Sequence, residues 1–126
     1  MVASAYSALV VEHFDHPRNV GHLEPGAGVI EAKAGRIDQG VVFRASARVS
    51  DDRLDALRFE TYGCPHCIAA SSWLSERLAQ ATLEDLRVWS WREAERVLEV
   101  PPEKRGKLLL LEDTVRQLAE RWGQAL

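Results

Sequence analysis

Apolar residues recur every three or four positions near the start of the chain. The pattern covers Tyr6, Leu9, Val10 and Phe14. This spacing places the four side chains on one face of a helix. We therefore predict a helix over residues 5–15 that stops at Pro17, because proline has no backbone N–H for a further helical hydrogen bond.

Residues 18–40 show no sustained hydrophobic period and contain five of the eight glycines of the chain. Glycine-rich segments of this kind are typical of irregular connections between elements. We predict one long loop here, and loops of this length inside compact domains often carry function.

A strand-like pattern follows in two stretches, residues 41–49 and residues 54–61. The aspartates at 51–52 favour a tight turn, so the two stretches predict an antiparallel hairpin. Because side chains alternate between the two faces of a strand, Leu57 and Phe59 would share one face. We expect helices to cover one side of that sheet.

After the hairpin the period becomes helical and indicates a helix that begins close to the two cysteines. Two short helices are expected next. Thr82 with Asp85 would start the first, and Ser90 with Glu93 would start the second as a capping box. A last helix is predicted over residues 108–122. The order of one helix, strands, then helices predicts an α+β fold, with a small antiparallel sheet packed against several helices.

Composition and charge are typical of an ordinary globular domain. With 126 residues, 46% hydrophobic and 28% charged, we expect residues 1–126 to form one globular domain. The formal net charge of −3 gives no global attraction to nucleic acid or to anionic lipid, so neither nucleic acid nor a membrane is expected as a partner. No apolar run could span a bilayer, and residues 1–5 do not resemble a secretory signal, so we expect a cytoplasmic protein.

The densest chemistry lies where Cys64 and Cys67 flank a proline and His66. The chain has no other cysteine, so a disulfide framework between distant segments is excluded. A thiolate at a helix start is stabilised by free backbone amides, which favours metal binding and nucleophilic attack. Cys64, Cys67 and His66 could therefore form part of a zinc or iron–sulfur site. Alternatively, the thiols cycle between dithiol and disulfide, or they simply pack in an apolar corner.

The tetrapeptide at residues 64–67 is similar to the active site of strongly oxidising thioredoxin-like proteins. In such a domain the motif would follow an early strand of a βαβ unit, whereas here it follows a hairpin at mid-chain. The tetrapeptide alone is therefore weak support for that fold.

The remaining histidines and the tryptophans have simpler explanations than catalysis. His13 is expected to pack beneath the first helix, while His16 and His22 are expected in solvent. A metal site shared by these three and the histidine beside the cysteines is the alternative. Three tryptophans fit helix faces, and Trp89 is the one that we expect in an exposed patch.

Several segments resemble the iron–sulfur cluster scaffold proteins of the IscU/NifU type. The letters HFDHPRNVG at residues 13–21 resemble the family signature H-(Y/F)-x-x-P-R-N-V-G, and RFETYGC at residues 58–64 resembles R-F-x-T-(F/Y)-G-C. IAASS at residues 68–72 is similar to the family's A-I-A-S-S-S. Three shorter matches, TLED, PPEK and LED, lie at residues 82–85, 101–104 and 111–113. The six matches keep the family's order over nearly the whole chain.

The resemblance implies a domain whose loops converge on a nascent cluster, held by three cysteines with an aspartate and, in some members, a histidine. It also implies a cysteine desulfurase as the sulfur donor, apo iron–sulfur proteins as clients, and no enzymatic turnover. Of the three family cysteines only Cys64 is present. The first falls at residues 39–41, or alternatively at residues 34–36, and the third falls at Lys107. Cys67 is an addition to the family pattern.

The leading hypothesis is a divergent scaffold or accessory protein that binds iron, a cluster such as [2Fe–2S], or zinc through Cys64, Cys67 and His66. Two thiolates cannot supply the four protein ligands of a [2Fe–2S] cluster. A homodimer, or a complex with another thiol protein, would complete the site. Two alternatives stay open: a dithiol redox or sulfur-carrier protein, and a regulator that docks on the desulfurase without carrying anything.

Overall fold

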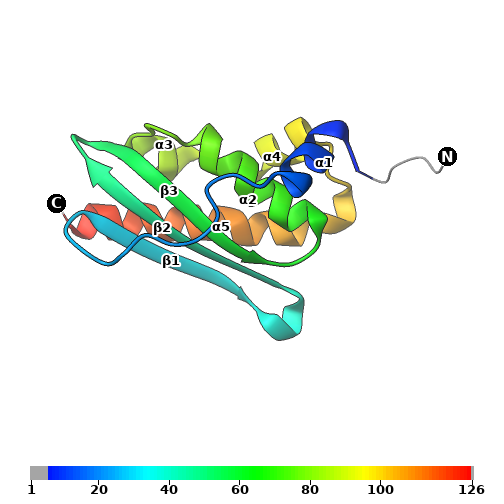
Figure 1. Ribbon diagram of the computed structural model, residues 1–126, viewed down its shortest axis with the longest axis horizontal. Helices are drawn as coiled ribbons and strands as arrows, with labels where there is room; N and C mark the ends of the chain where they lie inside the picture. Colours follow the sequence, from blue (N-terminus) through cyan, green and yellow to red (C-terminus); the bar gives the residue numbers. More distant parts are fainter. Residues whose placement is uncertain (1–5, 126) are drawn as a thin grey trace.

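A computed structural model describes residues 6–125 as a three-stranded antiparallel sheet packed against helices (Figure 1). The sheet has the strand order β1–β2–β3. In chain order the elements are α1 (Ala8–Asp15), β1 (Val29–Arg36), the short 3-10 helix η1 (Ile37–Gln39), β2 (Val41–Ser50), β3 (Arg53–Tyr62), α2 (Pro65–Arg77), α3 (Leu83–Val88), α4 (Trp91–Leu98), the short 3-10 helix η2 (Pro102–Lys104) and α5 (Arg105–Gln124). The predicted α+β fold is confirmed.

The first helix is present from Ala8 to Asp15, while Ala5 lies outside the described residues. The predicted hairpin is also confirmed, since β2 and β3 pair antiparallel. Asp51 and Asp52 both have positive φ angles, 53° and 61°. Two consecutive residues with a left-handed backbone conformation are typical of a type I′ turn, and the twist of that turn suits a two-residue hairpin loop.

The prediction of one irregular loop over residues 18–40 is wrong in its second half. There, β1 pairs with β2 over its whole length, from Val29 opposite Arg48 to Arg36 opposite Val41. The segment VIEAKAGR has few of the β-branched and aromatic residues that signal a strand. Small side chains suit this strand because α5 packs directly over it. Tertiary contact, not local propensity, stabilises β1.

On both edge strands of the sheet, β1 and β3, some backbone groups form hydrogen bonds to residues outside the sheet. On β1, the Gln117 side chain of α5 donates from Nε2 to the Lys33 carbonyl at 2.9 Å and accepts the Lys33 N–H at 3.2 Å. On β3, the Phe59 N–H donates to the Asn19 carbonyl and the Gly21 N–H donates to the Phe59 carbonyl, both at 3.0 Å. Unpaired strand edges invite aggregation, so these contacts also protect the sheet.

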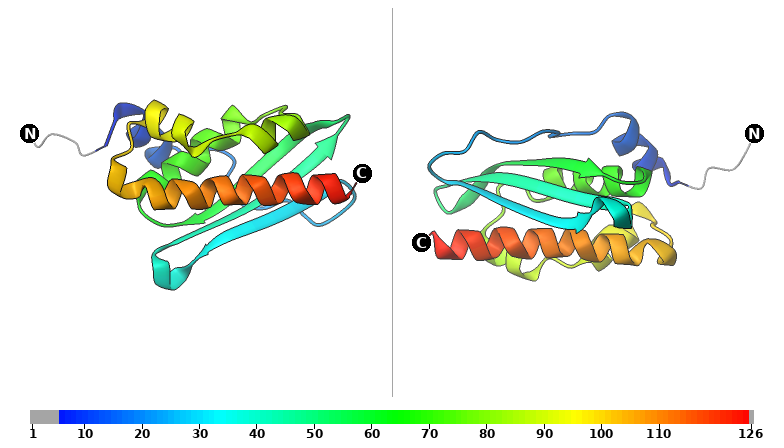
Figure 2. Two further views of the ribbon diagram at one scale, coloured as in Figure 1. Left: turned by 180° about the vertical axis from the view of Figure 1, so that it is seen from behind. Right: turned by 90° about the horizontal axis from the view of Figure 1, so that it is seen from below.

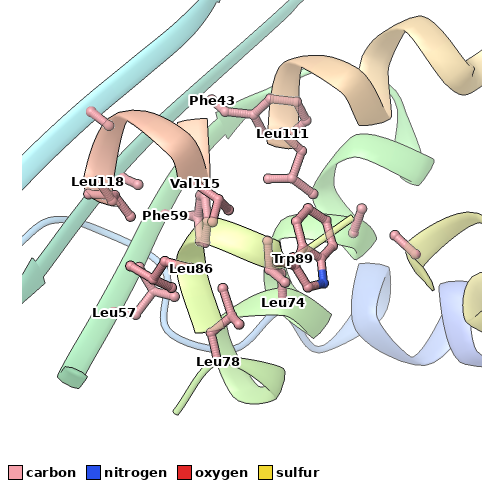
Figure 3. Close-up of a cluster of buried hydrophobic side chains, with 14 of the residues drawn as sticks. Phe43, Leu57, Phe59, Leu74, Leu78, Leu86, Trp89, Leu111, Val115 and Leu118 are labelled. Carbon is pink, nitrogen blue, oxygen red and sulfur yellow. The ribbon is translucent and has the colours of Figure 1, made fainter. Parts of the chain in front are cut away.

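The helices lie mainly on one face of the sheet. The long helix α5 runs along β1 and β2, and α2 lies against β3 (Figure 2). Among the described residues, no helix has the length and hydropathy needed to cross a bilayer. The core between sheet and helices gathers large side chains from both layers, including Phe43, Leu57, Phe59, Leu74, Leu78, Leu86, Leu111, Val115 and Leu118 (Figure 3).

The prediction that Trp89 forms part of an exposed patch is wrong. Its side chain is only 4% exposed and belongs to the core (Figure 3). The indole Nε1–H donates to the Glu93 carboxylate at 3.0 Å. That hydrogen bond satisfies the one polar group of the ring, so the indole can be buried at little cost.

The predicted capping box at Ser90 is also wrong, although Ser90 does cap α4. The Glu93 carboxylate does not return to the Ser90 backbone because Arg77 holds it, with Nε and Nη2 at 3.0 and 3.1 Å. The complete box is at the start of α3 instead. There the Thr82 hydroxyl accepts the Asp85 N–H at 3.2 Å, and the Asp85 carboxylate accepts the Thr82 N–H at 2.9 Å.

Candidate functional site

The two cysteines lie at the corner where β3 ends and α2 begins, as the sequence predicts. Cys64 is the N-cap residue of α2, with φ −76° and ψ 171°, and Pro65 is the first helical residue. Proline suits that position because its ring fixes a helical φ and the missing N–H would have had no helical partner. Cys67 follows within the first turn, so both thiols lie at the N-terminal end of one helix.

The two thiols are reduced and in contact. Their Sγ atoms are 3.6 Å apart, with one thiol donating to the other. Two sulfurs bound at about 2.3 Å to one tetrahedral ion would be about 3.8 Å apart. A disulfide would need about 2.05 Å. The pair is therefore spaced almost as a metal chelate requires, and a small movement would allow a disulfide.

Gly63 permits this close packing. A Cβ atom at Gly63 would lie 2.8 Å from the Cβ and 3.0 Å from the Sγ of Cys67. Real Cβ atoms do not come this close to their neighbours. A glycine is therefore required before Cys64 on steric grounds, because only a residue without a Cβ lets the backbone pass beside the buried thiol.

The two sulfurs differ in environment. Cys64 is partly buried, whereas Cys67 is 1% exposed. Burial opposes ionisation of Cys64, but the amide and thiol of Cys67, the amide of His66 and the charge of Lys104 outweigh it and lower the pKa of Cys64. Burial, reinforced by the neighbouring Cys64, raises the pKa of Cys67 to about 12. The pKa difference favours the Cys64 thiolate over the Cys67 thiolate.

His66 points into the protein interior. It is 4% exposed and lies against Tyr6, with ring centroids 4.7 Å apart and ring planes tilted by 54°. Burial and the positive charge of Lys104 lower the pKa of His66, against the effect of Glu103. Within residues 6–125 neither ring nitrogen has a hydrogen-bond partner.

The histidine is therefore not part of an assembled metal site in this conformation. Across the described part of the chain, no three His, Cys, Asp or Glu side chains are grouped so as to hold a metal ion. The structure brings Cys64 and Cys67 together and adds no third ligand of this kind to them. Metal binding by His66 stays a prediction, and it would require the ring to leave its buried position.

Two other segments converge on the cysteine corner. The carbonyl of Gly40, at the tip between η1 and β2, lies 3.6 Å from the position of a Cβ on Gly63. At the start of α5, Lys104 and Lys107 lie close enough for their charges to act on the two thiols. The resemblance places the missing family cysteines at residues 39–41 and at Lys107, so both vacated positions border the surviving thiols. The alternative placement, residues 34–36, lies within β1.

The PRNVG motif attaches the first helix and the following loop to α2. The Ser72 hydroxyl accepts the Arg18 N–H at 2.8 Å and contacts His13 Nδ1 at 2.8 Å. The Asn19 amide donates to the Ser75 hydroxyl at 3.0 Å. Sequence reasoning missed both serines, although small polar residues on the buried face of α2 were the available signal.

The predicted burial of His13 and the predicted exposure of His16 and His22 are confirmed. His13 is buried at 4% exposure, while His16 and His22 lie in solvent. Burial and the nearby Arg18 lower the pKa of His13, and the carboxylates of α1 and α2 only partly offset this. Through Ser72 and Ser75 the motif is attached to α2, the helix that begins at the two thiols.

Comparison with known proteins gives the same family throughout. The family model described as the NifU-like N terminal domain matches residues 5–124. The chain is 35% identical over 119 residues to the iron–sulfur cluster assembly scaffold protein IscU of Rickettsia prowazekii (strain Madrid E), covering 89% of this chain and 87% of that protein. It is 32% identical over 118 residues to IscU of Escherichia coli (strain K12), covering 89% of each.

A solved structure supports the fold. The N-terminal NifU-like protein of Brucella abortus superposes with a TM-score of 0.65 at 16% identity, covering 91% of this chain and 94% of that one. At this identity the likeness concerns the fold alone. The match of the family model to residues 5–124 and the 35% identity to a scaffold protein show the family. The chain belongs to the NifU-like N-terminal domain family.

Proposed function

We propose that this protein serves iron–sulfur cluster assembly as a divergent scaffold or accessory protein, with iron or a nascent cluster as its cargo. The observation that carries the proposal is the Cys64–Cys67 pair, two thiols 3.6 Å apart on the N-terminus of α2. Soft thiolates are the donors that iron–sulfur clusters use. Its relatives named as assembly scaffolds support the same role.

The pair supplies half of a cluster site. A [2Fe–2S] cluster takes four protein ligands, and this corner offers two thiols, which become thiolates when they bind metal. Lys107, where the resemblance puts a third cysteine, cannot substitute because its ammonium group has no lone pair until it loses a proton. We propose that a second copy of the chain brings two further thiolates, so that one cluster bridges a homodimer.

Sulfur and iron would reach this site from partners. On the family pattern, a cysteine desulfurase supplies the sulfur and apo iron–sulfur proteins receive the cluster. In this scaffold role the protein would bind and transfer its cargo, which needs no enzymatic turnover. Zinc is the alternative cargo, because two thiolates at this spacing also suit a tetrahedral ion.

Anaerobic reconstitution tests the proposal. The reduced full-length protein is mixed with ferrous iron and inorganic sulfide over a range of protein concentrations, and iron–sulfur absorbance is measured after desalting. We expect absorbance that depends on protein concentration and is lost in Cys64→Ser and Cys67→Ser. Exposed His16→Gln is the matched control and should behave as the wild type. Absence of absorbance at every concentration, or equal absorbance in the serine variants, would refute the proposal.

The second candidate function, a dithiol redox or sulfur-carrier protein, is favoured by the unequal exposure of the two thiols. A partly buried sulfur next to a fully buried one is the arrangement of a nucleophile and a resolving thiol. A defined Cys64–Cys67 reduction potential in protein that binds neither iron nor zinc would favour this candidate over the scaffold.

A further inference from the structure

The cysteine pair has one accessible member and one enclosed member. Part of the Cys64 surface reaches solvent, whereas Cys67 is 1% exposed. In this conformation Cys64 is therefore the residue that a sulfur donor can reach, and Cys67 is shielded from it. The two Sγ atoms are nevertheless only 3.6 Å apart. Any sulfur that is bound to Cys64 lies beside a second thiol that the donor cannot reach.

We infer that the pair converts sulfane sulfur into sulfide: Cys64 accepts the outer sulfur of a donor persulfide, and Cys67 then displaces that sulfur as hydrogen sulfide. The substrate class is a persulfide R–S–SH, on a protein or on a small thiol. The inference rests on the proposed function, because it provides sulfide for a cluster in a chain that lacks the family's third cysteine.

The first step is a transfer between thiols. The Cys64 thiolate attacks the outer sulfur of R–S–SH, so a bond forms between Cys64 Sγ and that sulfur while the donor S–S bond breaks. The donor leaves as R–SH with the proton that Cys64 released. The product is a persulfide on Cys64, and no net oxidation or reduction has occurred.

The second step is an internal reduction. Cys67 Sγ attacks Cys64 Sγ, a disulfide forms between them, and the bond from Cys64 to the outer sulfur breaks. The electron pair of that bond leaves with the outer sulfur, which takes the Cys67 proton and departs as hydrogen sulfide. The two thiols are oxidised to a disulfide and the sulfane sulfur is reduced by two electrons. An external dithiol reductant then restores the pair by exchange at the accessible Cys64.

The geometry supports the second step. The two atoms that must bond are already in contact at 3.6 Å, and the product needs about 2.05 Å. Gly63 has no Cβ, so no side chain at this position crowds the Cβ and Sγ of Cys67. Lys104 and Lys107 place positive charge near the two sulfurs, which stabilises the anionic persulfide and the departing hydrosulfide.

Single-turnover mass spectrometry tests the inference. Reduced full-length protein, freed of reductant without oxygen, is mixed with one equivalent of glutathione persulfide, alkylated, and analysed for intact mass and released sulfide. Wild type should give a disulfide that resists alkylation, with sulfide released in proportion to protein. Cys67→Ser should lose sulfide release and retain one sulfur atom, about 32 Da, on Cys64. Cys64→Ser should show neither sulfide release nor a retained sulfur atom, so it measures the background release of sulfide.

Two outcomes overturn the inference. One is sulfide release from Cys67→Ser as fast as from wild type, and the other is a glutathione adduct on Cys64 in place of a persulfide. Circular dichroism and thermal midpoints check that the variants fold. Cys67→Ala keeps an apolar side chain at the enclosed position. If the serine variant is unfolded, the alanine variant should retain the sulfur atom on Cys64 in its place.

Reconstitution with inorganic sulfide separates this inference from the proposed function, because inorganic sulfide bypasses the persulfide. Protein that assembles a cluster from inorganic sulfide but does not convert the persulfide retains the proposed function and refutes the inference. Protein that converts the persulfide but never binds iron refutes the proposed function and retains the inference.

Discussion

The chemistry of the site depends on two sulfur atoms with different surroundings. Cys64 is the N-cap residue of α2, and although burial opposes its ionisation, the amides of Cys67 and His66, the Cys67 thiol and the charge of Lys104 lower its pKa. Cys67 is enclosed, and its pKa is raised to about 12. The spacing of the two cysteines was visible in the sequence. Their inequality was not, because it depends on which face of the first helical turn meets the core.

Alkylation rates should report this inequality. A lowered pKa means that Cys64 thiolate persists at pH values below those of an ordinary thiol, and its reaction with iodoacetamide should slow as the pH falls through that pKa. Cys67 should stay protonated and unreacted in the same range. Peptide mapping after timed alkylation should find Cys64 labelled first, and Cys64→Ser should lose the fast reaction. Faster labelling of Cys67 would contradict the assignment.

A methyl group at Gly63 should disturb the corner. In Gly63→Ala the new Cβ would meet the Cys67 side chain at 2.8 Å, so the backbone or the thiol must shift. Overpacking of this kind costs about 1–3 kcal/mol in the free energy of unfolding. Urea denaturation measures this cost, and alkylation should label Cys67 faster than in wild type.

Gly106→Ala is the matched control. A Cβ at Gly106 would meet nothing within 4 Å, and the residue lies in α5. Alanine favours a helix over glycine by up to about 1 kcal/mol, so this variant should be equal to wild type or more stable. Equal losses in the two variants would remove the steric explanation for Gly63.

The elements differ in how well local sequence determines them. The helical period and the two aspartates of the turn predict α1, α5 and the hairpin because those signals are local. Strand β1 escaped prediction because its alanines and charged residues are poor strand formers, and contact with α5 supplies what they lack. The capping box was assigned to the wrong helix because Arg77, distant in the sequence, holds Glu93.

Gln117→Ala should loosen the edge of β1. The side chain makes two hydrogen bonds to the Lys33 backbone, and each contributes about 0.5–1.5 kcal/mol. We expect the free energy of unfolding to fall by about 1–3 kcal/mol in total. The Lys33 amide should exchange with solvent faster, as measured by hydrogen exchange. Exposed Glu120→Ala on the same helix is the control, and unchanged Lys33 exchange in Gln117→Ala would contradict the pairing.

At the scale of the whole molecule, the fold brings three distant segments to one corner: the tip before β2, the start of α2 and the start of α5. The ordered motifs predicted the fold class, while the positions that they assign to the missing family cysteines stay a prediction. The contact between the Gly40 carbonyl and the Gly63 region required the structure, because it joins segments far apart in the chain.

Lys107→Cys should return a third thiolate to the corner. With three soft donors in place of two, zinc affinity measured by chelator competition should rise at least about tenfold, which is about 1.4 kcal/mol. Lys107→Ala is the matched control because it removes the charge without adding a thiol. Equal affinities in the two variants would show that position 107 does not face the thiols.

Native mass spectrometry of anaerobically reconstituted protein would decide whether the two thiols hold a cluster, because it counts chains, iron and sulfide in one particle. We expect one cluster shared by two chains in wild type, and metal-free monomers in Cys64→Ser and Cys67→Ser. A cluster-bearing particle formed equally well by either serine variant, or wild type that never retains iron or sulfide, would contradict it.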